Sequence, residues 1–182
     1  MLQPADAPAA AFQVLSPLTP ERFASEYAGR VHRFAAMVMR NGQDSEDLAQ
    51  EALLKAIRGL AKFDQRGNVE AWMWRIVINT ARDSGRASVR QTALRDRLHA
   101  RSRAEFAVDP VELTVFNRLR DQDLLDAVRR LPVKPRTIIA LRFGAQLSNL
   151  EIGEQLRMRP RAVSMALHRA LQRLHSVLEA QS

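Results

Sequence analysis

Cysteine is absent from this chain of 182 residues, which excludes disulfide bonds, thiolate metal sites and cysteine nucleophiles. Glycine (7 residues) and tyrosine (1 residue) are scarce, which argues against a protein built from strands and tight turns. No apolar run approaches the roughly 18–20 residues that a membrane span needs. The first basic residue is Arg22, so no basic secretory signal is predicted and we expect a cytoplasmic protein without a membrane partner.

The residues that are abundant favour an all-α protein. Alanine, leucine, arginine and glutamine, which are good helix formers, are frequent. The formal net charge is +8, from 28 basic and 20 acidic residues. Residues 118–182 hold 12 basic and 6 acidic groups, whereas residues 1–86 hold 11 and 10, so the last third carries most of the excess. This distribution favours a polyanionic partner such as a nucleic acid.

Hydrophobic periodicity predicts two small helical domains joined by a flexible linker. Residues 1–20 hold four prolines and no helical pattern, which predicts a disordered lead-in. Apolar residues recur three or four positions apart within residues 21–86 and 119–178, which we take as the two domains. Residues 87–118 are arginine-rich and Asp109-Pro110 interrupts them, so they are predicted to be the linker.

Helix boundaries can be predicted from the capping residues. In the first domain one helix runs from Glu21 to the Asn41-Gly42 stop, a second begins at Asp44 or Ser45, and a third spans residues 69–86. The polar residues 64–68 precede the third helix as a loop. The second domain is expected to hold helices over residues 119–131, 135–143, 150–156 and 160–178.

A helix-turn-helix is the strongest local signal. Ser148 can cap a short helix, Arg157-Met158 makes a tight turn, and Pro160 suits the first turn of a longer helix. The longer helix has a predicted buried stripe of Val163, Leu167, Ala170, Leu171 and Leu174, opposite Arg161, Ser164, Met165, His168, Arg169 and Gln172. Residues 157–178 hold five arginines and no acid, which favours DNA binding over an ordinary hairpin with a solvated basic face.

The third helix carries a second candidate surface. At 100° per residue, Arg75, Asn79, Arg82 and Arg86 fall within an arc of about 60°. Trp72 borders the arc and either stacks on a base or packs in the core, whereas Trp74 lies on the opposite side and is predicted to be a core residue. Arginines beside a tryptophan suit single-stranded DNA, because a stacked base contributes about 1–3 kcal/mol.

The second helix carries an acidic patch of Asp44, Glu46, Asp47, Gln50 and Glu51. These residues either serve only to cap the helix or form a docking face for a basic partner protein. The four histidines have no partner at metal-ligand spacing, and no phosphate loop or nucleophile motif is present, so we expect no metal, no cofactor and no enzyme.

These motifs together resemble bacterial extracytoplasmic-function (ECF) RNA polymerase sigma factors of the sigma-70 family. Residues 44–51, Asp-Ser-Glu-Asp-Leu-Ala-Gln-Glu, resemble the family's core-polymerase-binding helix, and residues 63–79 resemble its promoter-melting segment. Leu131-Pro132, residues 141–143 and the helix-turn-helix resemble its second conserved domain. The resemblance covers residues 21–86 and 119–178, with both motif sets in the expected order.

The resemblance implies a transcription initiation factor that binds core RNA polymerase, recognises the −10 and −35 promoter elements and nucleates strand opening. It implies docking on the clamp of the large polymerase subunit through Asp44, Glu46, Asp47, Gln50 and Glu51. It implies −10 DNA binding through Asp64, Arg66, Gly67, Asn68, Trp72, Arg75, Asn79, Arg82 and Arg86. It implies −35 DNA binding through Arg159, Arg161, Ser164, Met165, His168 and Arg169. An anti-sigma factor as partner follows from family habit alone.

The chain departs from the family pattern in its recognition helix. Arg157 stands where the turn usually has glycine, and Ser164 and Ala166 stand where the family often has a basic residue. Our hypothesis is that −35 reading relies on the N-terminus of this helix. Three alternatives stay open: a stand-alone helix-turn-helix regulator, an adaptor that binds an acidic protein, and a sigma-like protein that docks without opening DNA.

Overall fold

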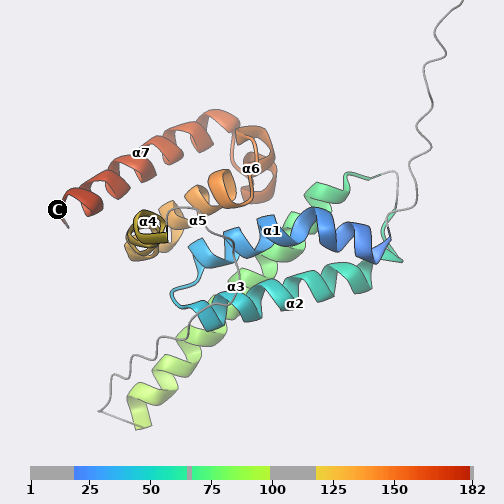
Figure 1. Cartoon of the computed structure of the whole chain (residues 1–182), viewed down its shortest axis with the longest axis horizontal. Coiled ribbons are helices and arrows are strands. Elements are labelled where there is room, and N and C mark those ends of the chain that lie inside the picture. Colours follow the sequence, from blue (N-terminus) through green and yellow to red (C-terminus); the bar gives the residue numbers. More distant parts are fainter. Residues whose placement is uncertain (1–18, 65–66, 99–117, 181–182) are drawn as a thin grey trace, which may run out of the picture.

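The computed structural model describes residues 19–64, 67–98 and 118–180, which form helices joined by short connections (Figure 1). No β-strand occurs in these ranges, so the predicted all-α class is confirmed. The elements are α1 (Pro20–Val38), α2 (Gly42–Leu60), α3 (Val69–Leu98), α4 (Arg118–Arg130), α5 (Val133–Ile139), the π-helical η1 (Ala140–Gly144), α6 (Asn149–Leu156) and α7 (Pro160–Glu179).

Helices α1 to α3 form the first module around an apolar core. The apolar residues that recur three or four positions apart in α1 are mostly buried, including Phe23, Val31 and Phe34. Phe34 meets Trp74 of α3 edge to face, with ring centroids 5.6 Å apart. Burying such aromatic and aliphatic side chains supplies the main stabilisation, at about 25 cal/mol per Å² of apolar surface removed from water. The core therefore fixes which face of each helix stays exposed.

Two boundaries in the first module differ from the sequence prediction. Asn41, not Asp44 or Ser45, is the N-cap of α2, because its side chain accepts a hydrogen bond from the backbone N–H of Asp44 at 2.7 Å. The third helix does not end at Arg86 but continues to Leu98, into the predicted linker. Residues 87–98 contain no glycine or proline, so nothing in their local chemistry stops the helix.

Helices α4 to α7 form the second module. The predicted single helix over residues 135–143 is instead α5 followed by the wider π-turn of η1, in which Ala145 N donates to Ala140 O at 2.9 Å. A small core includes Ala127, Leu131, Ile139, Ala170 and Leu174. Buried Arg136 donates to the carbonyl of Arg129 at the end of α4, and burial lowers the pKa of its guanidinium.

The two modules pack against each other, which the sequence pattern did not predict. Leu141, Leu147 and Ile152 belong to the same buried cluster as Phe34 and Trp74. Gly144 is required at this contact, because a Cβ there would lie 2.9 Å from the backbone N of Phe34.

Polar contacts join the modules as well. Arg30 of α1 donates through Nε to the carbonyl of Ala145 at 2.8 Å and pairs with Glu70 of α3. Gln155 of α6 donates to the carbonyl of Ala71 at 2.9 Å. Figure 1 shows α5 beside α1 as a result. In the described part of the chain no helix is long and apolar enough to cross a membrane.

Candidate nucleic-acid and protein interfaces

Helices α6 and α7 form the predicted helix-turn-helix. The Ser148 side chain caps α6, and the Glu151 carboxylate accepts a hydrogen bond from the backbone N–H of Ser148 at 2.7 Å, which completes a capping box. The Ser148 hydroxyl, which donates to Glu151 Oε2 at 2.6 Å, and the Ser148 backbone N–H together hold the pKa of the Glu151 carboxyl below its usual value. Arg157, which stands where the family's turn usually has glycine, ends α6 in the left-handed conformation, with φ 56° and ψ 45°.

The turn is tight because Gly153 has no side chain. A Cβ at Gly153 would lie 2.6 Å from the carbonyl oxygen of Met158. The backbone N–H of Met158 in turn donates to the carbonyl of Gly153 at 2.8 Å. Pro160 then occupies the first turn of α7, where its missing N–H is not needed. This local chemistry sets the angle at which α7 leaves the turn.

The exposed face of α7 is the predicted −35 surface. Arg159, Arg161, Ser164, Met165, His168 and Arg169 are all exposed. Val163, Ala170 and Leu174 are buried as expected and Leu167 is partly buried, but Leu171 is 39% exposed and does not belong to the buried stripe. The stripe is narrower than predicted because the small second module covers only one side of α7.

The predicted arginine-containing strip of α3 is exposed, whereas the two tryptophans of this helix pack against other side chains. Arg75, Asn79, Arg82 and Arg86 are exposed along one side of α3, as predicted. Trp74 is fully buried beneath Arg30, whose guanidinium carbon lies 5.6 Å from its ring centroid, which confirms its assignment to the core.

Trp72 is only partly buried. The centroid of its ring lies 4.9 Å from the ring centroid of Phe63 and 6.4 Å from that of Phe23. The structure thus gives Trp72 a packing role and leaves part of its surface accessible beside the loop.

The loop before α3 is held by its own backbone. Gly67 N donates to the carbonyl of Asp64 at 2.8 Å, and Asn68 caps α3 by accepting a bond from Ala71 N at 3.0 Å. The capping role of Asn68 was missed by the sequence prediction, although an asparagine before an apolar helix is a recognisable cap signal. Asp64, Gly67 and Asn68 are exposed, and Arg66 lies outside the described residues.

The acidic patch lies on the exposed side of α2. Asp44, Glu46, Asp47, Gln50 and Glu51 are exposed, and only Asp44 contributes to the helix cap, through its bond from Asn41 Nδ2 at 2.9 Å. Gln50 Nε2 donates to Glu46 Oε1 at 2.8 Å, and Lys55 pairs with Glu51 at 2.6 Å. Capping therefore does not account for Asp47 and Glu51, which lie beyond the first turn.

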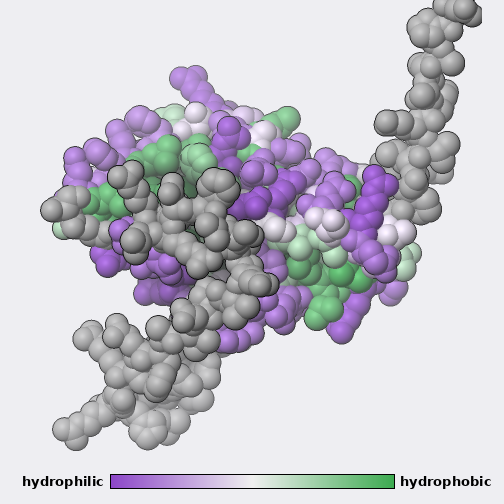
Figure 2. All heavy atoms as spheres, in the orientation of Figure 1, coloured by the Kyte–Doolittle hydropathy of each residue, from purple (hydrophilic) through white to green (hydrophobic). Residues whose placement is uncertain are grey.

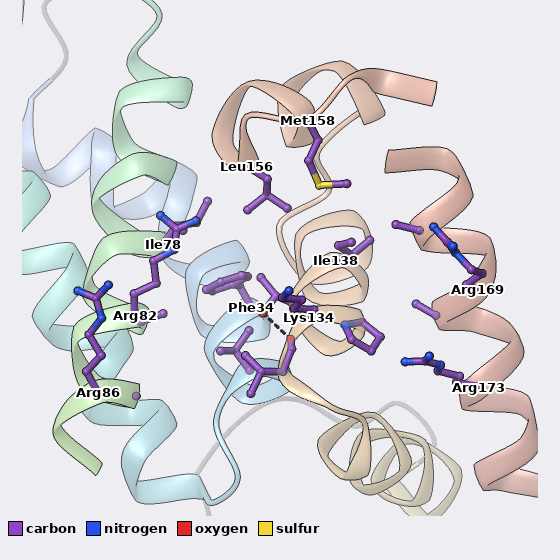
Figure 3. A pocket seen from close by; sticks show the side chains of 18 residues that line it. Phe34, Ile78, Arg82, Arg86, Lys134, Ile138, Leu156, Met158, Arg169 and Arg173 are labelled. Carbon is purple, nitrogen blue, oxygen red and sulfur yellow. Dashed lines mark hydrogen bonds between the residues drawn. The ribbon is translucent and has the colours of Figure 1, made fainter. Parts of the chain in front are cut away.

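A groove of about 1150 Å³ separates the two candidate DNA surfaces (Figure 3). Its floor is apolar and includes Phe34, Ile138 and Leu156. Arg82 and Arg86 of α3 line one side, and Arg169 and Arg173 of α7 line the other. Three of the residues predicted to contact the −10 and −35 elements, Arg82, Arg86 and Arg169, thus line the same groove. Among the described residues, no cluster of His, Cys, Asp or Glu could hold a metal ion.

These features define a two-module helical protein with a DNA-binding helix-turn-helix. Residues 23–91 match the family model for sigma-70 region 2, and residues 121–174 match that for sigma-70 region 4. The chain is 32% identical over 145 residues to the ECF RNA polymerase sigma factor SigD of Mycobacterium tuberculosis, covering 79% of this chain and 67% of SigD. It is also 32% identical over 160 residues to SigE of Mycolicibacterium smegmatis, covering 86% of this chain but 60% of SigE.

Solved structures agree with this assignment at the level of the fold. The sigma factor RpoE of Bartonella quintana, crystallised with the anti-sigma factor NepR, superposes with a TM-score of 0.69 at 22% identity, covering 89% of this chain and 98% of RpoE. CnrH, in complex with the cytosolic domain of CnrY, gives a TM-score of 0.63 at 20% identity, covering 90% and 89%. The chain belongs to the ECF sigma factors of the sigma-70 family, which are transcription initiation factors.

Proposed function

We propose that this protein recruits core RNA polymerase through α2, reads duplex −35 DNA through α7 and holds the single-stranded −10 element against α3 and the loop before it. The observation that carries the proposal is the difference in charge between the exposed surfaces of α2 and α7. Four acidic residues lie on the exposed side of α2, whereas α7 presents exposed basic and polar side chains with no acid before Glu179. A basic helix suits a phosphate-lined groove, and an acidic one suits a basic protein surface.

Strand opening in this proposal is a binding process without covalent chemistry. Unstacking a base costs a few kcal/mol, and capture of the extruded base by residues 64–68 together with backbone contacts to Arg75 and Arg82 offsets that cost. Because capture and opening are one event, sequence selection and melting occur at the same place. We accordingly propose that the protein is not an enzyme and that it acts in the cytoplasm, where promoters and polymerase meet.

Because α3 and α7 line opposite sides of one groove, the proposal includes a conformational step. Arg169 of the predicted −35 surface lines the same groove as Arg82 and Arg86 of the predicted −10 surface, whereas the two promoter elements are separate stretches of DNA. We therefore propose that the modules separate when the protein binds promoter DNA. Cysteines introduced at Ala71 and Gln155 and joined by a short bismaleimide should abolish promoter binding, and a cleavable linker should restore it on cleavage. Full promoter binding by the cross-linked protein would contradict separation.

The relatives suggest a protein that regulates this step. RpoE is in complex with the anti-sigma factor NepR, and CnrH is in complex with the cytosolic domain of CnrY. We propose that an anti-sigma factor likewise binds this chain and keeps the two modules together.

The direct test is gel filtration of the protein with core RNA polymerase, followed by run-off transcription of the peak fraction on a library of promoter fragments. Co-elution with new, sequence-selective transcripts supports the proposal and yields the promoter motif. Co-elution without transcripts would indicate a docking protein that does not open DNA. Absence of co-elution would reject polymerase docking and favour a stand-alone regulator.

A further inference from the structure

One leucine of α2 is exposed where the helix pattern does not require it. The buried positions of α2 are Ser45, Leu48, Ala49, Ala52 and Ala56, which follow the spacing of a core-facing stripe. Leu54 is out of step with them, and 50% of its surface is exposed. Figure 2 shows apolar surface over the C-terminal half of α2, the part that contains Leu54.

Leu54 lies on the same strip of α2 as the acidic patch. At 100° per residue, Asp47, Glu51, Leu54 and Arg58 fall within an arc of about 60°. All four side chains are exposed. Neighbours three or four positions apart on a helix touch one another, so these side chains form one continuous surface.

The charge on the strip changes sign from one end of α2 to the other. Its N-terminal half is acidic, with Asp44, Asp47 and Glu51, and Leu54 follows. Its C-terminal end is basic, with Arg58 in the last turn of α2. An apolar side chain surrounded by charged residues is the arrangement of an interface anchor with a polar rim, in which the rim excludes water and selects the partner.

We propose that Leu54 is the apolar anchor by which α2 docks on core RNA polymerase, and that the charges on either side of it fix the direction of docking. This inference rests on the proposed function of α2. The polymerase element would present, along α2 from its N-terminus to its C-terminus, basic side chains, an apolar pocket and then an acidic side chain. Leu54, Arg58 and this order of charges are additions to the acidic docking residues.

A second copy of this chain is a poorer occupant. An acid-to-base strip is self-complementary when two copies run antiparallel, so a dimer through α2 satisfies the charges. From Asp47 to Arg58, however, the strip is about 17 Å long at 1.5 Å per residue, and it holds one exposed leucine. Stable interfaces bury about 1,200–2,000 Å² in total, which exceeds what one such strip supplies. Polymerase can add contacts elsewhere on the protein, whereas a dimer confined to the strip cannot.

The test measures the affinity for purified core RNA polymerase. Because the chain has no cysteine, Ser182→Cys provides one thiol for a fluorescent label, and binding is followed by fluorescence anisotropy. Leu54→Ala should raise the Kd about tenfold, equivalent to ~1.4 kcal/mol. The matched control is Leu124→Ala on α4, where the leucine is 45% exposed, and its Kd should stay within twofold of the parent. Arg58→Glu should raise the Kd about threefold at low salt and less at high salt, because a rim charge is screened.

The outcomes separate this inference from the proposed function. If Asp47→Ala and Glu51→Ala weaken binding while Leu54→Ala and Arg58→Glu do not, α2 docks without the anchor and the inference is wrong. If none of the four variants weakens binding, the proposed docking through α2 fails with it. Analytical ultracentrifugation covers the remaining case, since a dimer that Leu54→Ala dissociates would assign the strip to self-association and overturn the inference. Thermal melting followed by circular dichroism checks that each variant is folded. We expect the variants to fold because the substituted residues are exposed.

Discussion

Gly153→Ala tests whether the helix-turn-helix depends on close backbone approach. A new Cβ would lie 2.6 Å from the carbonyl oxygen of Met158, which is a backbone atom and cannot rotate away. The turn has to open, which strains or breaks the 2.8 Å bond from Met158 N to the carbonyl of Gly153. Overpacking of this kind costs about 1–3 kcal/mol, and loss of one hydrogen bond costs about 1 kcal/mol.

A gain in helix propensity opposes this cost. Alanine is better than glycine inside a helix by about 1 kcal/mol, so the net loss of stability should be about 1–3 kcal/mol. For a chain of this length each kcal/mol shifts Tm by about 2–4 °C, so we expect Tm to fall by about 2–12 °C. Thermal unfolding followed by circular dichroism at 222 nm measures the change.

Gly85→Ala is the matched control, because the same propensity gain applies without the clash. Gly85 lies within α3, is exposed, and a Cβ there would meet no atom within 4 Å. Its substitution should raise Tm by about 2–4 °C. A Gly153→Ala protein as stable as the parent, or stabilised to the extent of Gly85→Ala, would refute the close-approach argument.

Three further predictions concern the same module. Arg157→Gly should raise stability by about 1 kcal/mol, because glycine adopts the left-handed conformation at φ 56° without strain, and a lower Tm would contradict this. Ser148→Ala should cost about 1 kcal/mol through loss of the α6 cap. The pKa of Glu151 is lowered in the folded state, so the stability that its ionised carboxylate contributes is complete above pH 4.5 and is lost as the pH falls through the lowered pKa. The difference in unfolding free energy between Ser148→Ala and the parent, measured by urea unfolding at several pH values, should therefore shrink in acid. A difference that stays constant with pH would count against the Ser148–Glu151 bond. Arg161→Ala should weaken binding of upstream promoter DNA by about 1–3 kcal/mol and lower the salt slope by about 1, and upstream binding that survives Arg161→Ala but is lost in His168→Ala would refute recognition by the helix N-terminus.

Features set by short-range chemistry could be predicted from the sequence. The cap by Ser148, the left-handed turn at Arg157 and the exposed basic face of α7 each depend on residues within a few positions of one another. The exposure of Asp47 and Glu51 on α2 follows from the 3.6-residue period in the same way. Local competition limited the prediction at the start of α2, where Asn41, Asp44 and Ser45 are all good caps and the structure uses Asn41.

Other features were decided by contacts between residues far apart in the chain. The helical period placed Trp74 in the core, but the partial burial of Trp72 was decided by the space that Phe23 and Phe63 leave for its ring. The continuation of α3 to Leu98 was missed for a local reason, because the arginine-rich residues after Arg86 show no apolar stripe even though they favour a helix.

Periodicity and capping are local properties, so the all-α class, the two helical modules and the chemistry on the faces of α2, α3 and α7 follow from the amino-acid sequence. How the modules meet depends on the tertiary structure. Gly144 lies against the backbone of Phe34, and Arg30 bonds to Ala145, across more than a hundred residues of chain. No local pattern encodes such a contact, because its stability comes from shape and hydrogen bonding between surfaces that exist only after each module has folded.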